Sequence, residues 1–165
     1  MRELFIMRHA KSSWDDPSLA DFDRPLNQRG KSDAPLMGKH LAKIGVKPDL
    51  IIASPAKRAK KTAKIVAEEI GYNPEKILYR ETIYEASPQS LLYMVCQLPK
   101  DAKRVMIVGH NPGLTQLANI LGDIMIDNLP TAGIVGIVFD TSKWEEACRM
   151  KGQTVLFDYP KKLKQ

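Results

Sequence analysis

Short apolar runs alternate with longer amphipathic stretches along the whole chain, and this alternation restricts the fold more than any other feature of the sequence. The apolar runs are four to seven residues long, which suits buried strands. Strands that alternate with helices are typical of an α/β domain with a mainly parallel, buried sheet. The expected strands are Leu4–Met7, Leu50–Ala53, Lys76–Tyr79, Val105–Val108, Ile134–Phe139 and Thr154–Phe157.

The first helix has a clear end and two alternative starts. It stops at Gly45, because glycine commonly follows the last turn of a helix. If Asn27 caps its start, Pro35 lies inside the helix, whereas a start near Ser32 places Pro35 in the first turn. The other expected helices are 56–70, 90–98 and 113–121, with a loop at 124–132 and a frayed tail after Asp158.

The helix expected at 56–70 has the clearest boundary signals. Ser54 is a favourable N-cap residue, and Pro55 suits the first helical position. Gly71 ends the helix.

Length and apolar patterning indicate one domain without a membrane span. The chain has 165 residues, and we expect a single domain over 1–160 with a basic tail at 161–165. No apolar run is long enough to cross a membrane. Arg8 and His9 also interrupt the first run before it reaches the length of a signal peptide.

Cysteine content points to a reducing compartment. Cys96 and Cys148 are far apart in the sequence, and Cys96 lies in a helical apolar stretch. We therefore expect a buried reduced thiol at Cys96 rather than a disulfide or a metal ligand. The expected protein is cytoplasmic and monomeric.

The net charge of +6 and the pI near 9.3 raise the question of nucleic-acid binding. Most lysines are scattered over several helices and the tail, and no aromatic residues interleave with them as a stacking platform. We expect no nucleic-acid partner, and a mildly positive surface fits a phosphorylated, acidic substrate. On the second helix, one basic face predicts either a solvated surface or a docking site for an acidic phosphoprotein; its residues are Lys57, Lys60, Lys61 and Lys64.

Two histidines follow two of the expected strands. Arg8-His9 ends the first strand, and His110 follows the strand 105–108 within Gly109-His110-Asn111-Pro112. Arg58 lies in the first turn of a helix after a third strand. Ligands of open α/β sheets gather at the carboxyl ends of the strands, and helix starts attract anions. These residues therefore predict a phosphate pocket.

The chemistry of phosphoryl transfer suits these residue types. Arginine supplies permanently charged bidentate donors for phosphoryl oxygens, and a neutral imidazole can attack phosphorus. Its second ring nitrogen then needs an acceptor, for which we expect a backbone carbonyl. A metal site is the alternative for the two histidines, but neither lies in a His-x-x-x-His spacing or near a cysteine pair. Taken singly, each residue also has an ordinary structural interpretation: a capped histidine, a turn residue or a solvated helix arginine.

Four sequence blocks together resemble the histidine phosphatase superfamily, which includes cofactor-dependent phosphoglycerate mutase. The blocks occur in family order between residues 4 and 121. Within that family the chain is most similar to the small SixA-type phosphohistidine phosphatases. The resemblance implies a three-layer α/β/α sandwich of about six strands. The blocks are Arg8-His9-Ala10, Arg24-Pro25-Leu26 with Gly30, Ser54-Pro55-Ala56-Lys57-Arg58-Ala59 with Thr62-Ala63, and Gly109-His110-Asn111-Pro112.

The resemblance also implies roles for individual residues. His9 would be the nucleophile, Arg8 and Arg58 would clamp the phosphoryl oxygens, and His110 would be a cationic or hydrogen-bonding partner. Ala10 replaces the family's usual glycine, at little cost if its φ is negative. No metal or other cofactor is implied. Further candidate substrate-binding residues are Arg24, Ser12 and Asn111, the last being alternatively an N-cap.

Two residues have less certain roles. Asp21 either orients Arg24 or, as we favour, is solvated. Trp14 is expected to be a partly buried packing residue or to line the pocket mouth.

A proton donor is the weakest part of the resemblance. Ester-hydrolysing relatives place a glutamate after the third strand, where this chain has Glu81 and Glu85. Each could donate the proton, but we favour a surface carboxylate for each. An alkoxide leaving group needs a proton, whereas the imidazole of a phosphoramidate leaves with less help. The lack of a clear proton donor therefore favours phosphohistidine as the substrate.

Three functions follow from these observations. The first is a metal-independent phosphatase with a covalent phosphohistidine intermediate, acting on a phosphorylated protein. The second keeps the pocket but hydrolyses small phosphomonoesters. The third is a non-catalytic phosphate-binding module. The short loops predict an open, shallow pocket in each case.

Overall fold

The computed structural model describes residues 1–165. Its strands are β1 (Arg2–Arg8), β2 (Leu50–Ala53), β3 (Leu78–Tyr79), β4 (Arg104–Gly109), β5 (Ile134–Phe139) and β6 (Gln153–Asp158). Its α-helices are α1 (Gln28–Lys43), α2 (Lys57–Ile70), α3 (Pro88–Cys96), α4 (Gly113–Leu121), α5 (Trp144–Ala147) and α6 (Pro160–Leu163). Three 3₁₀ turns complete the list: η1 (Asp21–Asp23), η2 (Pro74–Lys76) and η3 (Glu81–Ile83). None of the helices combines the length and the apolar character needed to span a bilayer.

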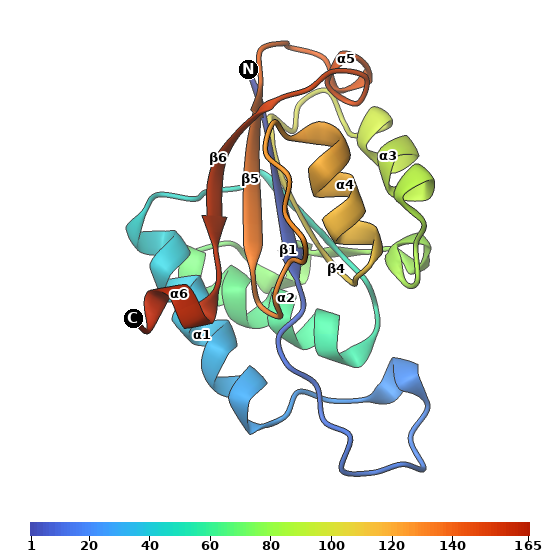
Figure 1. Cartoon of the computed structure of the whole chain (residues 1–165), viewed down its shortest axis with the longest axis vertical. Coiled ribbons are helices and arrows are strands. Elements are labelled where there is room, and N and C mark those ends of the chain that lie inside the picture. The colour runs from blue at the N-terminus through green and yellow to red at the C-terminus, as the bar shows by residue number, and fades with distance from the viewer.

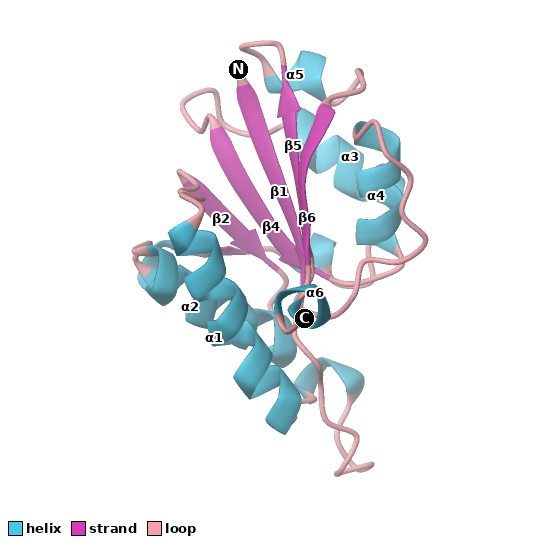
Figure 2. Cartoon of the chain, turned by 60° about the vertical axis from the view of Figure 1, so that its left-hand side comes forward, coloured by secondary structure: helices cyan, strands magenta, loops and turns pink.

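One six-stranded sheet forms the centre of the molecule, in the order β3-β2-β4-β1-β5-β6. The first four strands of this order are parallel to one another. Strand β5 pairs antiparallel with β1, and β6 pairs antiparallel with β5. Helices α1 and α2 cover one face and α3 and α4 the other, which gives the expected three-layer sandwich (Figures 1 and 2). The expected strand at 76–79 is shorter, because η2 occupies its first part.

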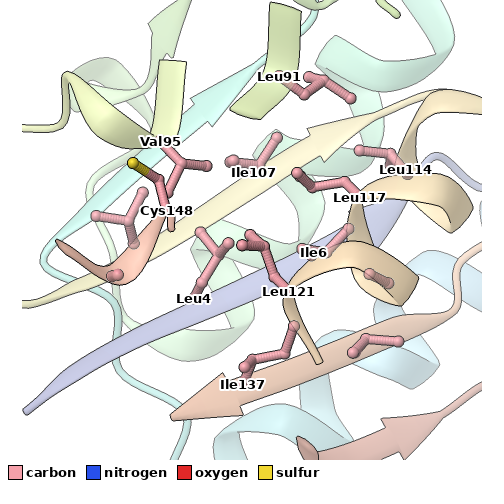
Figure 3. Close-up of a cluster of buried hydrophobic side chains, with 14 of the residues drawn as sticks. Leu4, Ile6, Leu91, Val95, Ile107, Leu114, Leu117, Leu121, Ile137 and Cys148 are labelled. Carbon is pink, nitrogen blue, oxygen red and sulfur yellow. The ribbon is translucent and has the colours of Figure 1, made fainter. Parts of the chain in front are cut away.

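Two apolar clusters bury the two faces of the sheet. The cluster under α3 and α4 contains 22 buried residues, among them Leu4, Ile107 and Leu117 (Figure 3). The second, under α1 and α2, contains 19. Both faces of the central strands are therefore buried, which explains why β1 and β4 are continuous apolar runs rather than alternating ones.

Helix α1 starts at the earlier of its two expected positions. The side chain of Asn27 accepts a 2.8 Å hydrogen bond from the backbone N–H of Gly30, and the helix continues through Pro35. Packing of α1 against α2 and the sheet outweighs the lost backbone hydrogen bond, because the apolar face of the helix, including Met37 and Leu41, is fully buried.

Ser54 is not the N-cap of α2, which corrects the sequence-based prediction. The helix begins one residue later than expected, at Lys57, and the cap residue is Ala56, which makes no side-chain hydrogen bond. The Ser54 hydroxyl accepts from the N–H of Ala56 at 3.2 Å and also contacts His110. Ser54 thus belongs to the turn before the helix.

The chain after Asp158 is folded, contrary to the frayed tail that was expected. Residues Pro160–Leu163 form α6, and the Lys164 ammonium lies 2.8 Å from a carboxylate oxygen of Asp33. Asp33 is fully buried in α1 and needs a positive partner there. The ion pair therefore attaches the C-terminus to α1.

Cys96 and Cys148 form a disulfide, so the prediction of reduced thiols is wrong. The end of α3 packs against α5, which brings Cα atoms 52 residues apart in sequence to 5.3 Å. Sequence spacing does not reveal such a contact. Because the two cysteines are oxidised, they no longer support a cytoplasmic location.

Candidate active site

The register of the sheet places three strand ends at one level. Arg8 at the end of β1 pairs with Gly109 of β4, and Ala53 of β2 pairs with Val108. His110, which follows the middle strand β4, therefore lies between Ser54, which follows β2, and His9, which follows β1. The backbone N–H of His9 donates to Gly109 at 3.0 Å, and that of Ser54 donates to Val108 at 3.0 Å.

These strand ends open into a cavity of about 230 Å³. Its lining contains four cationic side chains and no carboxylate, so it suits a small anion such as a phosphoryl group. The sequence predicted eight of its ten members and did not single out Lys11 and Thr131. The lining residues are Arg8, His9, Lys11, Ser12, Trp14, Arg24, Arg58, His110, Asn111 and Thr131.

His9 is held in one tautomer by a backbone carbonyl. Its Nδ1 lies 2.7 Å from the carbonyl oxygen of Ala10, which can only accept, so Nδ1 carries the proton. The expected backbone acceptor is thus confirmed. The other nitrogen, Nε2, has no hydrogen-bond partner in the protein and is not fully buried. Its lone pair is free on the cavity side of the ring.

The imidazole of His9 is neutral at pH 7. Burial is the main reason that its pKa falls from 6.5 to about 3, and the nearby His110, Arg58 and Arg8 act in the same direction. The hydrogen bond to Ala10 opposes this shift without cancelling it. A neutral imidazole keeps the lone pair that a nucleophile needs.

His110 faces His9 across the site, with ring centroids 5.1 Å apart. Its Nε2 is hydrogen-bonded to the Ser54 hydroxyl at 2.8 Å, and its Nδ1 is buried without a partner. Burial and then the charge of Arg58 lower its pKa to about 4, so His110 is also neutral. His110 is therefore an uncharged hydrogen-bonding group, and its role toward a phosphoryl group stays a prediction.

Arg8 and Arg58 each keep a buried donor unused. The Nε atoms of both arginines have no hydrogen-bond partner, and neither does Nδ1 of His110. These are three of only five buried side-chain polar atoms without a partner in the protein. Burial and the charge of Arg58 lower the pKa of Arg8. Unpaired buried donors are costly, and their concentration at one place is typical of a site that binds an anion.

Asp21 aligns two arginines of the cavity. Its Oδ1 accepts from Arg24 at 3.1 Å, and its Oδ2 accepts from Arg58 at 3.0 Å and from the Tyr84 hydroxyl at 2.6 Å. The Tyr84 hydrogen bond is the main cause that lowers the pKa of Asp21 to about 2, and Arg58 adds to it. Orientation of Arg24, rather than solvation, is therefore the role the structure shows, and the bond to Arg58 was not predicted.

Arg24 is buried between Asp21, Ser12 and Trp14. Its Nη1 donates to the Ser12 hydroxyl at 2.8 Å, and its guanidinium carbon lies 3.5 Å from the centroid of the Trp14 ring. Trp14 itself is 72% exposed, which corrects the prediction of a partly buried packing residue. It lines the cavity and shields one face of Arg24 from solvent.

Buried contacts behind the cavity fix the segment after β1. The Thr62 hydroxyl accepts from the N–H of Ala10 at 3.0 Å and donates to the carbonyl of Arg58 at 2.8 Å. It therefore links the segment after β1 to the first turn of α2. A Cβ at Gly30 would lie 2.2 Å from the Lys11 carbonyl oxygen, which explains why glycine is required there. The φ angle of Ala10 is not positive, as expected for alanine in place of glycine.

Three of the predicted site residues, Asn111, Glu81 and Glu85, do not offer a free polar group to the cavity. Asn111 lines the cavity, but its amide is used within the fold: it accepts from Thr115 and donates to the carbonyl of Leu129 at 2.9 Å. Glu81 and Glu85 are exposed and do not line the cavity. Tyr84, between them, forms a T-shaped contact with the ring of His110, with centroids 5.4 Å apart.

No group of three or more His, Cys, Asp or Glu side chains is arranged to hold a metal ion. A larger hollow of about 680 Å³ lies at the β3 edge, under α3. It contains no histidine or carboxylate, so the smaller cationic cavity is the better candidate for chemistry.

The family model of the histidine phosphatase superfamily (branch 1) matches residues 4–87, about half of the chain. The chain belongs to this superfamily. A chloroplastic protein of Arabidopsis thaliana is 31% identical over 159 residues, which cover 92% of this chain and 72% of that protein. Superfamily membership supports phosphatase activity, because the residues matched include His9, Arg24 and Arg58.

Solved structures of the superfamily share the whole fold. A proposed phosphohistidine phosphatase SixA from Agrobacterium tumefaciens is 27% identical, with a TM-score of 0.81 over 96% of this chain and 98% of that one. The protein histidine phosphatase SixA in complex with tungstate gives a TM-score of 0.82 at 21% identity, over 98% of this chain and 99% of that one. The three-layer sandwich is therefore the fold of this histidine phosphatase chain from end to end.

Proposed function

We propose that the chain is a phosphohistidine phosphatase that forms a covalent intermediate on His9. The observation that carries this proposal is the free Nε2 of a neutral His9 in a cavity lined by three arginines. The lone pair of Nε2 attacks phosphorus, and the phosphorus–nitrogen bond of the substrate breaks with its electron pair moving to the departing imidazole. Arg8 and Arg58 balance the charge of the phosphoryl oxygens.

Hydrolysis of the intermediate completes the reaction. Water attacks phosphorus, the bond to His9 Nε2 breaks with its electron pair returning to that nitrogen, and inorganic phosphate leaves with both protons of the water. The negative charge of a bound phosphoryl group raises the pKa of His110, which then donates a hydrogen bond to a phosphoryl oxygen. Arg24 and Ser12 also line the cavity and donate hydrogen bonds to phosphoryl oxygens. In this scheme, the cationic side chains supply the charge stabilisation and no metal takes part.

The absence of a carboxyl group from the cavity lining favours a phosphoramidate over a phosphate ester. An alkoxide requires a proton donor, and the low pKa of Asp21, which bonds to two arginines of the cavity, keeps its carboxylate ionised. A phosphohistidine with its second ring nitrogen protonated releases a neutral imidazole and needs no such donor. The SixA proteins of similar fold are named for this substrate, which supports the proposal.

A substrate panel and a labelling experiment test the proposal. We expect turnover of phosphohistidine peptides and of phosphoramidate to exceed that of sugar phosphates and aryl phosphates. Brief incubation with ³²P-phosphoramidate should label the wild-type protein and not the His9→Ala variant. Faster turnover of esters would support the alternative substrate class, and unchanged turnover by His9→Ala would exclude His9 as the nucleophile. Binding of phosphate without any turnover would instead indicate a non-catalytic module.

A further inference from the structure

A second hollow, of about 420 Å³, adjoins the cavity and is lined mainly by lysines. Pro25 and Leu26 form its apolar part, directly after Arg24 of the cavity, and Lys57 precedes Arg58. Five lysines complete the lining; they are Lys31, Lys57, Lys60, Lys61 and Lys64, and together with Pro25 and Leu26 they form what we name the lysine groove.

The lysine groove is a continuous positive surface. Four of its lysines are spaced 3 or 4 residues apart on α2, so they form one stripe along the helix, and Lys31 faces it from the first turn of α1. All five are exposed, none forms a salt bridge, and no carboxylate lines the groove. By contrast, Lys162 and Lys164 of the C-terminal helix are each paired with an aspartate.

Like charges at this spacing weaken a helix, so the stripe is not explained by the stability of α2. Glu68, one turn beyond Lys64, is the first acidic residue after the stripe, and it lines a neighbouring hollow. The stripe begins next to Arg58 and extends away from the cavity. Its position and charge complement a chain of carboxylates that continues from a bound phosphoryl group.

We propose that the lysine groove binds an acidic segment of the substrate polypeptide, next to its phosphorylated residue. The proposal rests on the proposed function and defines its substrate class. From Lys57 to Lys64 the helix rises by about 10 Å, which about three residues of extended peptide span. The preferred acidic residues therefore lie roughly two to five positions from the phosphohistidine. A single-stranded nucleic acid fits less well, because the groove contains no aromatic side chain for base stacking and no arginine.

Two phosphohistidine peptides test the proposal, one with Asp and Glu at these positions on both sides and one with Ser and Gln. We expect kcat/KM of the wild-type protein to be higher for the acidic peptide by about tenfold or more at low salt, and the advantage to shrink at high salt. The triple variant K60E/K61E/K64E should lose this preference. The triple variant K100E/K103E/K143E changes the net charge equally at the opposite end of the sheet and should keep it.

The groove and the chemistry are separable in this experiment. Phosphoramidate, which has no flanking residues, reports on the chemistry alone. Binding of the unphosphorylated acidic peptide, measured by fluorescence anisotropy, reports on the groove alone. Failure to hydrolyse phosphoramidate, with peptide binding that depends on Lys60, Lys61 and Lys64, would defeat the proposed function and leave the groove. No preference for the acidic peptide, equal loss in both triple variants, or stronger binding of a single-stranded RNA would overturn the groove proposal.

Discussion

The hydroxyl of Tyr84 donates a 2.6 Å hydrogen bond to the carboxylate of Asp21, which in turn accepts from two arginines of the cavity. Tyr84 comes from the turn after β3 and Asp21 from the loop after β1, 63 residues earlier. The hydrogen bond raises the pKa of Tyr84 to about 12, so the phenol stays a donor. The contact thus links the two loops that flank the site.

We expect Asp21→Asn to reduce kcat/KM by roughly 10- to 100-fold, since a hydrogen bond to a charged group contributes about 1.5–3 kcal/mol. The cause is misalignment of Arg58 and Arg24, so the affinity for the phosphate analogue tungstate should fall as well, as measured by calorimetry. Tyr84→Phe should have a smaller effect in the same direction. Asp23→Asn is the matched control, because Asp23 lies on the same loop without a side-chain partner; an equal loss there would refute the aligning role of Asp21.

We expect the protein to lose stability as the pH falls from about 6.5 towards 4. The folded-state pKa values of His9 and His110 lie at about 3 and about 4, below the unfolded value of 6.5, so in this window the unfolded chain binds more protons. Each histidine then lowers the free energy of unfolding by up to about 1.4 kcal/mol per pH unit. Urea denaturation at a series of pH values measures this slope.

The double variant His9→Ala/His110→Ala should have a shallower pH dependence of stability in the same window, because the two groups with shifted pKa values are gone. The same slope in the variant and the wild type would show that other groups cause the loss.

Thr62→Val is expected to destabilise the fold by about 1–3 kcal/mol, because it leaves the buried N–H of Ala10 without its acceptor. Turnover should fall too, since Ala10 holds the imidazole of His9 in place. Thr62→Ser retains the hydroxyl and should restore most of both quantities. Urea denaturation and phosphoramidate turnover measure them. A stable but inactive Thr62→Val protein would mean that the hydroxyl acts in the chemistry rather than in the fold.

Replacement of both cysteines by serine, or reduction with dithiothreitol, should lower the free energy of unfolding by about 2–4 kcal/mol, as removal of a cross-link that closes a long loop does. Activity should change little, because α5 lies at the end of the sheet opposite the cavity (Figure 1). Thermal unfolding with and without reductant measures the first effect. A large loss of activity in the folded, reduced protein would show a link between α5 and the site that the fold does not suggest.

The layered α/β fold, and the sheet edge at which the candidate site lies, follow from local patterns in the sequence. Apolar runs of strand length, alternating with amphipathic helices, leave few other architectures, and His9, Arg58 and His110 follow strands or start helices within that pattern. Parallel strands bring such positions to one edge whatever the details of packing. This is why the lining of the cavity was largely predictable.

The contacts between residues far apart in the sequence depend instead on how the elements pack. Asp21 and Tyr84, Cys96 and Cys148, and Ser54 and His110 are each brought together by packing between elements, and no periodicity in the sequence encodes such a pair. The same reason applies to the glutamates considered as proton donors, which the turn after β3 leaves exposed while Tyr84 contacts the site. Local patterns specify the elements, whereas side-chain partners depend on how those elements pack.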